Sequence, residues 1–267
     1  MAEFFGFGGY QRTPEGYFSW QHLLFVSCLM VIMIASAVLI GLRYRHKDEK
    51  AKNVPLIVAA IAIDAFEIFK IVLCCIREGD PFHWRLNLPL FLCSIQLITI
   101  PLAAFAKGRL KEAALDFVFI FGALGAVAGT YFAGQNYGAY PVLSFDNVVS
   151  GITHSISGFA AIYIGVSGLV SMKKENVIFT LFIMAFFCIV AYVCDLLIPY
   201  NYMFLMRGDG TPYDIFYDLV NGNRILYPLT VMFLFMLYMA AVYGTAYVIP
   251  SFRKQAFAKE TVDLQLN

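Results

Sequence analysis

The chain has 267 residues, of which 60% are hydrophobic and only 14% are charged, whereas roughly 25% of the residues in soluble proteins are charged. With a mean hydropathy of +0.72 it has more apolar surface than one core can bury, so lipid must cover the rest. Nineteen Lys and Arg against 18 Asp and Glu leave a net charge of +1, which gives no reason to expect a nucleic acid partner. The composition predicts a polytopic membrane protein.

Seven apolar stretches have about the twenty residues that a helix needs to cross roughly 30 Å of hydrocarbon. The sequence therefore predicts an all-α fold, a polytopic membrane helix bundle with seven transmembrane helices. We expect a single membrane domain over 1–255 and a polar cytoplasmic tail over 256–267. In chain order, the stretches are 19–42, 54–76, 88–106, 113–132, 148–170, 177–199 and 225–249.

The distribution of Lys and Arg predicts the orientation of the bundle. The loops 43–53, 107–112 and 171–176 and the end of the chain after Pro250 together hold 13 of these residues, and the segments on the other side hold five. Loops rich in Lys and Arg stay on the cytoplasmic side of a membrane. We therefore expect the N-terminus outside and the C-terminus in the cytoplasm.

Two patterns of small or reactive residues predict no site by themselves. The six Cys contain no C-x-x-C pair, so we expect no disulfide framework, no metal site and no cofactor. Gly125 and Gly129 form a G-x-x-x-G pair, which is typical of close contacts between membrane helices. The general frequency of glycine in membrane helices is the alternative explanation, and we expect no chemistry from either residue.

Ionisable residues within the spans are the main indication of function, because each costs a few kcal/mol to insert and usually faces a cavity or a partner. Counting from the ends of the spans places several of them within roughly 5–10 Å of the outer surface. This common depth predicts one polar cavity in the outer half of the bundle. The residues placed at that depth are His22, Lys70, Cys74, Cys93, His154 and Asp195.

Each of these polar residues also has a purely structural interpretation. Asp64, Glu67 and Lys70 follow one another at a spacing of three, so they form a stripe on one helix face and can neutralise each other as an ion pair. His22 can be an anchor at the membrane interface, and His154 can be a packing residue with satisfied hydrogen bonds. The sequence leaves these alternatives open.

Cys93 follows Leu88-Pro89-Leu90-Phe91-Leu92. We expect Pro89 to occupy the first turn of the third helix, where its missing N–H costs nothing, and to place Cys93 one turn deeper. A Cys in a membrane helix is usually an inert small side chain, and reactivity requires a thiolate with a neighbouring base. His154 reaches the same depth from another helix, so a Cys–His pair is geometrically possible.

The chain resembles the YwaF-like bacterial integral membrane proteins, which are related to eukaryotic transmembrane protein 164. Cys93 in its Leu-Pro-Leu context, a His in the fifth span and above all Asn201-Tyr202-Met203-Phe204-Leu205 carry this resemblance. It implies a seven-helix fold in the bacterial plasma membrane and, from the eukaryotic relative, an acyltransferase that remodels phospholipids through Cys93 and His154. Phe91 stands where many members have His, and Ser94 where they often have Asp.

We therefore predict that the protein acts on membrane lipids by cysteine-based acyl transfer or hydrolysis. Cys93 is the predicted nucleophile and His154 the predicted general base and acid. The groups expected to tune their charge or to bind the substrate are His22, Glu67, Lys70, Asp195 and Asn201. The oligomeric state cannot be read from the sequence.

Two other classes of function remain as alternatives. A transporter or channel for an ion or small polar solute would use Asp64, Glu67 and Lys70 as its path, but polar groups become rare in the cytoplasmic half. Haem would require both imidazoles of His22 and His154 to face one ring. A retinal protein is disfavoured, because the seventh span lacks a Lys for a Schiff base.

Overall fold

The computed structural model describes residues 2–248, and these fold entirely into helices, turns and loops without a strand. Two short 3₁₀ helices, η1 (His83–Asn87) and η2 (Tyr202–Phe204), lie in the connections. The predicted tail over 256–267 lies outside the described residues. The α-helices are α1 (Ala2–Phe5), α2 (Trp20–Tyr44), α3 (Glu49–Glu78), α4 (Gln96–Phe105), α5 (Gly108–Tyr131), α6 (Gly134–Ala139), α7 (Phe145–Ser167), α8 (Lys174–Leu197), α9 (Asp214–Leu219) and α10 (Leu226–Val248).

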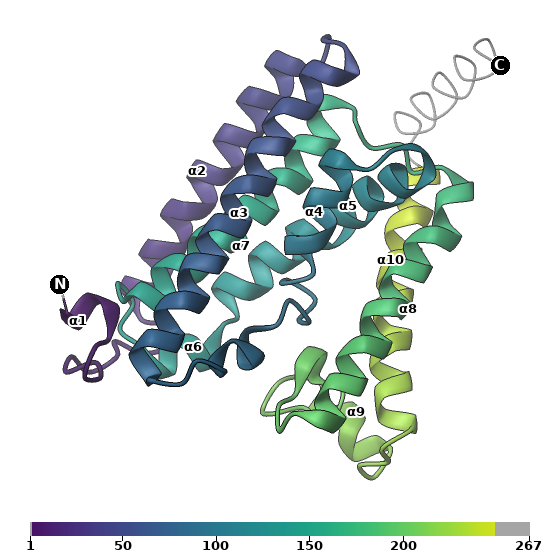
Figure 1. Ribbon diagram of the computed structural model, residues 1–267. Helices are drawn as coiled ribbons and strands as arrows, with labels where there is room; N and C mark the ends of the chain where they lie inside the picture. The colour runs from purple at the N-terminus through teal and green to yellow at the C-terminus, as the bar shows by residue number, and fades with distance from the viewer. Residues whose placement is uncertain (1, 249–267) are drawn as a thin grey trace.

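The bundle is built around α5 and α7, which pack against each other more extensively than any other pair of described helices. The long helices α2 and α3 run side by side along α7, and α4 lies between α3 and α5 (Figure 1). The pair α8 and α10 packs on the other side of α5, with α9 at the far end of this pair (Figure 1). The core is therefore formed where α3, α4, α5 and α7 meet.

Local sequence signals explain where these helices begin and end. Ser19 and Ser144 are N-caps whose side chains accept hydrogen bonds from the backbone N–H groups of His22 and Asn147. At the other end of α7, Gly168 adopts the left-handed conformation with φ 75° and closes the helix. These caps fix the start of α2 and both ends of α7, the helix that carries His154.

The protein is a membrane protein, and within residues 2–248 five helices are long and apolar enough to cross a bilayer. They are α2, α7, α8, α10 and the stretch Gly108–Ala139, which contains α5 and α6. The helix α3 has 30 residues but carries Asp64, Glu67 and Lys70 in its middle, and α4 has only ten residues. The seven spans and the orientation thus remain predictions.

The expected third helix over 88–106 is wrong in its first half. Residues 88–95 form a non-helical segment, and α4 starts only at Gln96. Pro89 therefore lies well before the helix instead of in its first turn. A tight turn, in which the N–H of Leu90 bonds to the carbonyl of Leu88 at 2.7 Å, takes the place of the expected helix start.

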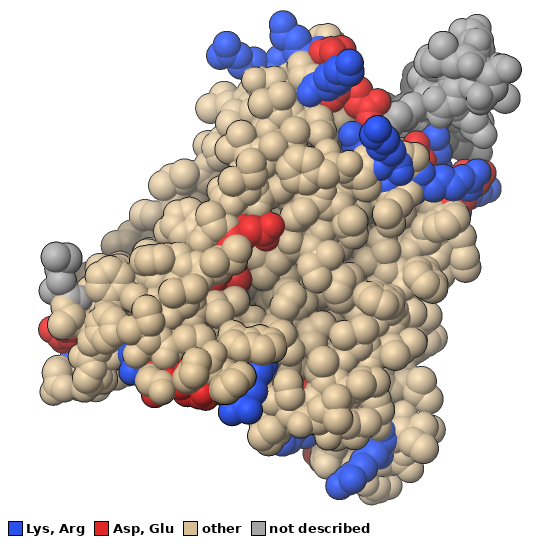
Figure 2. Space-filling model, in the orientation of Figure 1, with Lys and Arg blue, Asp and Glu red and all other residues tan. Residues whose placement is uncertain are grey.

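The surface agrees with a molecule that lies in a bilayer. Basic and acidic side chains gather at the two ends of the molecule, with a broad uncharged band between them (Figure 2). Within that band only a few acidic side chains are visible in this view (Figure 2). Because hydrocarbon cannot solvate a charge, this distribution is the one expected for a protein surrounded by lipid.

Candidate functional site

The segment 88–95 presents Cys93 directly before α4. The carbonyl of Cys93 accepts a hydrogen bond from the N–H of Gln96 at 3.4 Å, and the N–H of Ile95 bonds to the carbonyl of Phe91 at 2.9 Å. Cys93 therefore lies just before the N-terminal end of α4, which is the positive end of the helix dipole. This position favours a developing thiolate over one in the middle of a helix.

His154 lies on α7 and is held in one orientation by the backbone of its own helix. Its Nδ1 is 2.7 Å from the carbonyl oxygen of Ser150. A carbonyl only accepts hydrogen bonds, so Nδ1 carries the proton of the neutral ring and Nε2 is left as an acceptor. This is the tautomer that a general base for a thiol requires.

The structure brings the Cys93 thiol and the His154 imidazole close enough for each to act electrostatically on the other. Since Nδ1 is occupied by Ser150, the thiol can donate to Nε2. Both residues border a small cavity of about 50 Å³. Its lining residues come from α3, the segment 88–95, α4 and α7. They are Ile63, Glu67, Lys70, Cys93, Ser94, Leu97, Ser150, Thr153 and His154.

Two glycines of α5 make room for this pair. A Cβ atom on Gly129 would lie 1.9 Å from Nε2 of His154, and one on Gly125 would lie 3.3 Å from Cβ of Cys93. The first distance is impossible without moving the imidazole, and the second is a tight contact. The G-x-x-x-G pair, from which no chemistry was expected, therefore forms the wall against which both reactive side chains lie.

The predicted stripe on α3 is only partly in the site. Lys70 Nζ and Glu67 Oε1 form an ion pair at 2.5 Å, and both residues line the cavity. Lys70 is also close enough to His154 to act on it electrostatically. Asp64, one turn earlier, does not line the cavity. The ion pair neutralises Lys70 in part and places a cation and an anion beside the thiol.

His22, a predicted site residue, does not line the Cys93 cavity. Both of its ring nitrogens form hydrogen bonds with backbone groups. Its Nδ1 accepts the N–H of Phe18 at 3.2 Å, and Nε2 donates to the carbonyl of Thr130 at 3.0 Å. The ring packs on Tyr137, with 3.8 Å between the two ring centroids. His22 thus ties the start of α2 to the end of α5 and leaves no free nitrogen for a haem iron.

Asp195 and Asn201 also lie outside the cavity and instead shape the loop that follows α8. Asp195 Oδ1 accepts the N–H of Tyr202 at 2.7 Å. The side chain of Asn201 donates to the carbonyl of Arg207 at 2.7 Å and accepts the N–H of Met206 at 2.9 Å. These bonds hold the loop in its conformation. They give a structural reason for the presence of Asp195 and Asn201, which we expected to act on substrate.

The same loop supports the segment that carries Cys93. The hydroxyl of the buried Tyr202 donates to the carbonyl of Arg85 at 2.6 Å and accepts the N–H of Leu88 at 3.2 Å. Phe91 packs against the rings of Tyr200, Tyr202 and Phe204. The string Asn201-Tyr202-Met203-Phe204-Leu205 is therefore a support for the nucleophile segment, and Phe91 is part of that contact.

A charged cluster fixes the two helices that contribute Lys70 and His154. The Arg77 guanidinium binds both carboxylate oxygens of Asp146, at 2.7 and 3.2 Å, and so joins the end of α3 to the start of α7. Tyr10 donates to the same carboxylate. Burial, followed by the hydrogen bond and charge of Asp146, raises the pKa of Tyr10. Burial acts to lower the pKa of Arg77, but Asp146 outweighs it and the pKa is raised, so the clamp stays charged at neutral pH.

Sequence reasoning missed this clamp and the two glycines, for different reasons. Arg77 and Asp146 are 69 residues apart in the chain, so no spacing in the sequence connects them. Gly125 and Gly129 did have a signal, their spacing of four, but it indicates only that something comes close to the helix. It does not say whether that is a backbone or an imidazole.

Comparison with known proteins gives one match. The model of the TMEM164 family matches residues 17–249, which includes every residue of the cavity. No curated protein and no solved structure matches the chain. The match to the family thus covers most of the chain.

Proposed function

Because the chain belongs to the TMEM164 family and Cys93 and His154 line the same small cavity, we propose that it acts on membrane lipids by cysteine-based acyl transfer or hydrolysis. The observation that carries this proposal is the orientation of His154. With Nδ1 bound to the Ser150 carbonyl, the basic nitrogen is the one that faces the thiol. The Ser150 bond would also satisfy a packing histidine, and it is the acceptor left at Nε2 beside a cysteine that supports the proposal.

In the first half of the reaction the sulfur attacks the carbonyl carbon of a lipid ester. His154 takes the thiol proton through Nε2, and a C–S bond forms while the ester C–O bond breaks. His154 then returns the proton to the leaving alkoxide, which departs as a lysolipid with a free hydroxyl. The acyl chain remains on Cys93 as a thioester, so no oxidant or metal is required.

In the second half His154 takes a proton from an acceptor hydroxyl, whose oxygen attacks the thioester. The C–S bond breaks, the acyl group passes to the acceptor, and His154 gives the proton back to the sulfur. A second lysolipid as acceptor gives acyl transfer, and water gives hydrolysis. Lys70, 2.5 Å from Glu67 and on the cavity wall, supplies a cation beside the oxyanion that forms in both halves.

The size of the cavity sets a condition on this reaction. Its volume of about 50 Å³ holds a few water molecules, since one needs roughly 10–15 Å³ by this measure. Sites that hold larger ligands have roughly 300–1,000 Å³. A lipid ester therefore enters only when the walls separate, and the non-helical segment 88–95 is the wall with the fewest helical hydrogen bonds.

Transport of an ion or small polar solute is the second candidate. The stripe of Asp64, Glu67 and Lys70 on a membrane helix is the feature that favours it. Two of these residues neutralise each other as an ion pair, and the cavity they line is small. A solute flux in proteoliposomes that Glu67→Gln stops and Cys93→Ala leaves intact would select transport over lipid chemistry.

The decisive experiment traps the thioester. Purified protein is incubated in vesicles containing a phospholipid with an alkyne-tagged acyl chain, and the tag on the protein is measured before and after neutral hydroxylamine. We expect a hydroxylamine-sensitive adduct on the wild type. Cys93→Ala should abolish it, and His154→Ala should reduce its rate of formation roughly 10²–10⁴-fold, the usual contribution of a general base.

Cys28→Ala is the matched control, because Cys28 is an exposed cysteine on α2 outside the cavity. It should form the adduct like the wild type. An adduct of unchanged size and rate in Cys93→Ala would reject Cys93 as the nucleophile. An adduct lost in both cysteine variants would show that the label reports general loss of folded protein.

A further inference from the structure

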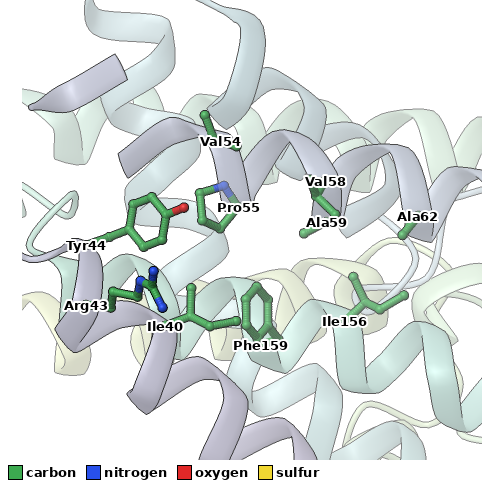
Figure 3. Close-up of a pocket in the computed structure, with 10 residues that line it drawn as sticks. All are labelled: Ile40, Arg43, Tyr44, Val54, Pro55, Val58, Ala59, Ala62, Ile156 and Phe159. Atoms are coloured by element: carbon green, nitrogen blue, oxygen red, sulfur yellow. The ribbon is translucent and has the colours of Figure 1, made fainter. Parts of the chain in front are cut away.

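A second and much larger hollow lies on the side of the bundle, among α2, α3 and α7. It is a groove of about 490 Å³, within the range of roughly 300–1,000 Å³ that is usual for ligand sites. None of its lining residues also lines the Cys93 cavity. The lining residues, shown in Figure 3, are Ile40, Arg43, Tyr44, Val54, Pro55, Val58, Ala59, Ala62, Ile156 and Phe159.

The groove has an apolar body and a polar end. Arg43 and Tyr44 lie together at one end, and Ala62 and Ile156 lie at the other (Figure 3). Val58, on the wall, is 60% exposed, so the groove is open to what surrounds the bundle. In a protein embedded in a bilayer, that surrounding is lipid. An apolar trough with a cation at one end has the shape and polarity of a single lipid molecule.

Arg43 is not neutralised by the protein. The basic residues Lys111 and Lys173 at the same end of the bundle pair with Glu49 and Glu112. Arg43 has neither an ion pair nor a hydrogen bond with any residue of the described part of the chain. A guanidinium binds phosphate oxygens in a bidentate geometry, so this unpartnered group can bind a headgroup phosphate.

The local charge favours an anionic lipid over a zwitterionic one. Residues 43–53 hold five basic side chains, and each Lys or Arg beside a membrane surface adds to the attraction for anionic headgroups. Arg43 is the member of this cluster that also lines the groove. The other four raise the local concentration of anionic lipid, and Arg43 selects the molecule whose tail can enter the trough.

We propose that the groove among α2, α3 and α7 is a binding site for one anionic phospholipid, with its phosphate on Arg43 and an acyl chain along Val58, Ala62 and Ile156. The lipid belongs to the leaflet at the Arg43 end of the bundle. Cys93 plays no part in this binding. The site is therefore independent of the proposed reaction, and a Cys93→Ala variant should retain the lipid as well as the wild type does.

Native mass spectrometry of the full chain in detergent tests this site. Phosphatidylglycerol is added as the anionic probe, phosphatidylcholine as the zwitterionic probe and inorganic phosphate as a probe without a tail. We expect one tightly bound phosphatidylglycerol and less phosphatidylcholine. Arg43→Gln should weaken the binding of phosphatidylglycerol by about tenfold, as expected for the loss of a charge-assisted bidentate contact.

Arg45→Gln is the matched control, since Arg45 belongs to the same basic loop but does not line the groove, and it should retain the lipid. Ala62→Phe fills the trough and should also release the lipid. Val58→Trp blocks the open wall without entering the core and serves if Ala62→Phe misfolds. Equal losses of phosphatidylglycerol binding in Arg43→Gln and Arg45→Gln would overturn the proposal, because the lipid would then be held by the overall positive charge of the loop.

Three other results would also overturn the lipid site. Equal retention of phosphatidylcholine and phosphatidylglycerol would remove the anionic preference. Binding of inorganic phosphate as tight as that of phosphatidylglycerol would show that the apolar trough contributes nothing to the binding. A dimer that Ala62→Phe dissociates, with no lipid bound in the wild type, would assign the groove to a second copy of the chain.

Discussion

Two buried polar centres lie on α5, and they differ in how completely they are satisfied. Near the start of α5, the fully buried carboxylate of Asp116 accepts hydrogen bonds from four donors. They are the N–H groups of Ser171 and Met172, the amide of Asn176 and the hydroxyl of Tyr243. Near its other end, Gly125 and Gly129 leave space for a thiol, an imidazole and a small cavity.

This difference distinguishes a buried polar centre that stabilises the fold from one that can react with a ligand. The Asp116 centre joins α5, the connection between α7 and α8, α8 itself and α10, and each of its two carboxylate oxygens accepts two hydrogen bonds. The Cys93 centre has a basic nitrogen, Nε2 of His154, together with a thiol and an adjacent cavity. A carboxylate inside a membrane bundle is ordinarily a stronger candidate for a functional residue than a cysteine. Here the four hydrogen bonds to Asp116 give it a structural role, and the cavity lies beside Cys93.

The largest effect on stability is expected at Asp116. Asp116→Ala leaves four buried donors without an acceptor, and each costs about 1–3 kcal/mol, so we expect a total loss of roughly 3–5 kcal/mol after relaxation. Thermal unfolding of the detergent-solubilised protein measures it. Asp218→Ala, at an exposed position on α9, should change stability by less than about 0.5 kcal/mol. A stable Asp116→Ala protein without the thioester adduct would instead make Asp116 part of the chemistry.

Gly129→Ala should produce the opposite pattern, a large loss of reactivity with a smaller loss of stability. The new Cβ would lie 1.9 Å from Nε2 of His154, so the imidazole must turn away from Cys93. We expect adduct formation to slow by roughly 10²-fold, the lower end for losing a general base. Gly244→Ala, where a Cβ meets no atom within 4 Å, is the control. An unchanged rate in Gly129→Ala would separate His154 from the reaction.

Glu67→Gln tests whether the ion pair matters to the reactive centre. Lys70 loses the partner 2.5 Å away, so a less neutralised cation remains beside His154 and opposes its protonation during thiol attack. We expect adduct formation to slow by about tenfold, corresponding to roughly 1.4 kcal/mol. Lys70→Met separates the two roles, because it removes this repulsion and also removes the cation beside the oxyanion. Faster adduct formation in Glu67→Gln would contradict the assigned role of the pair.

Most helices of this fold are predictable from hydropathy, and the segment 88–95 shows where that reasoning ends. The ranges predicted for six of the seven stretches fall on α2, α3, α5, α7, α8 and α10. The remaining stretch, 88–106, which is the third in chain order, is as apolar as the others, but its first half is a turn. Hydropathy reports where a segment lies and not its backbone conformation, and Pro89 is compatible with both a helix start and a turn.

Depth counting had a similar limit at the site. It placed His22, Cys93, His154 and Asp195 at one level, but a level contains every direction around the bundle. The structure brings Cys93 and His154 together and gives His22 and Asp195 backbone partners elsewhere. Which side of its helix a residue occupies depends on how the helices pack, and that information lies in long-range contacts such as Arg77 with Asp146.

The smallest expected effect tests whether the loop after α8 positions the nucleophile. Tyr202→Phe removes the bond to the Arg85 carbonyl and leaves the N–H of Leu88 without its acceptor, which should cost about 1–2 kcal/mol of stability. It should also change the rate at which Cys93 reacts with a maleimide, because the segment before α4 loses its support. We expect the maleimide rate to rise, because a looser segment exposes the Cys93 thiol to the reagent.

Tyr238→Phe is the control for this last comparison, since its hydroxyl donates only to the Ile120 carbonyl on α5, at 3.1 Å. It should cost a similar amount of stability, about 1 kcal/mol, without changing the maleimide rate. Equal maleimide rates in the two tyrosine variants would reduce Tyr202 to a packing residue. A rate that rises only in Tyr202→Phe, together with slower thioester formation, would show that the loop holds Cys93 against His154 and limits its access to other reagents.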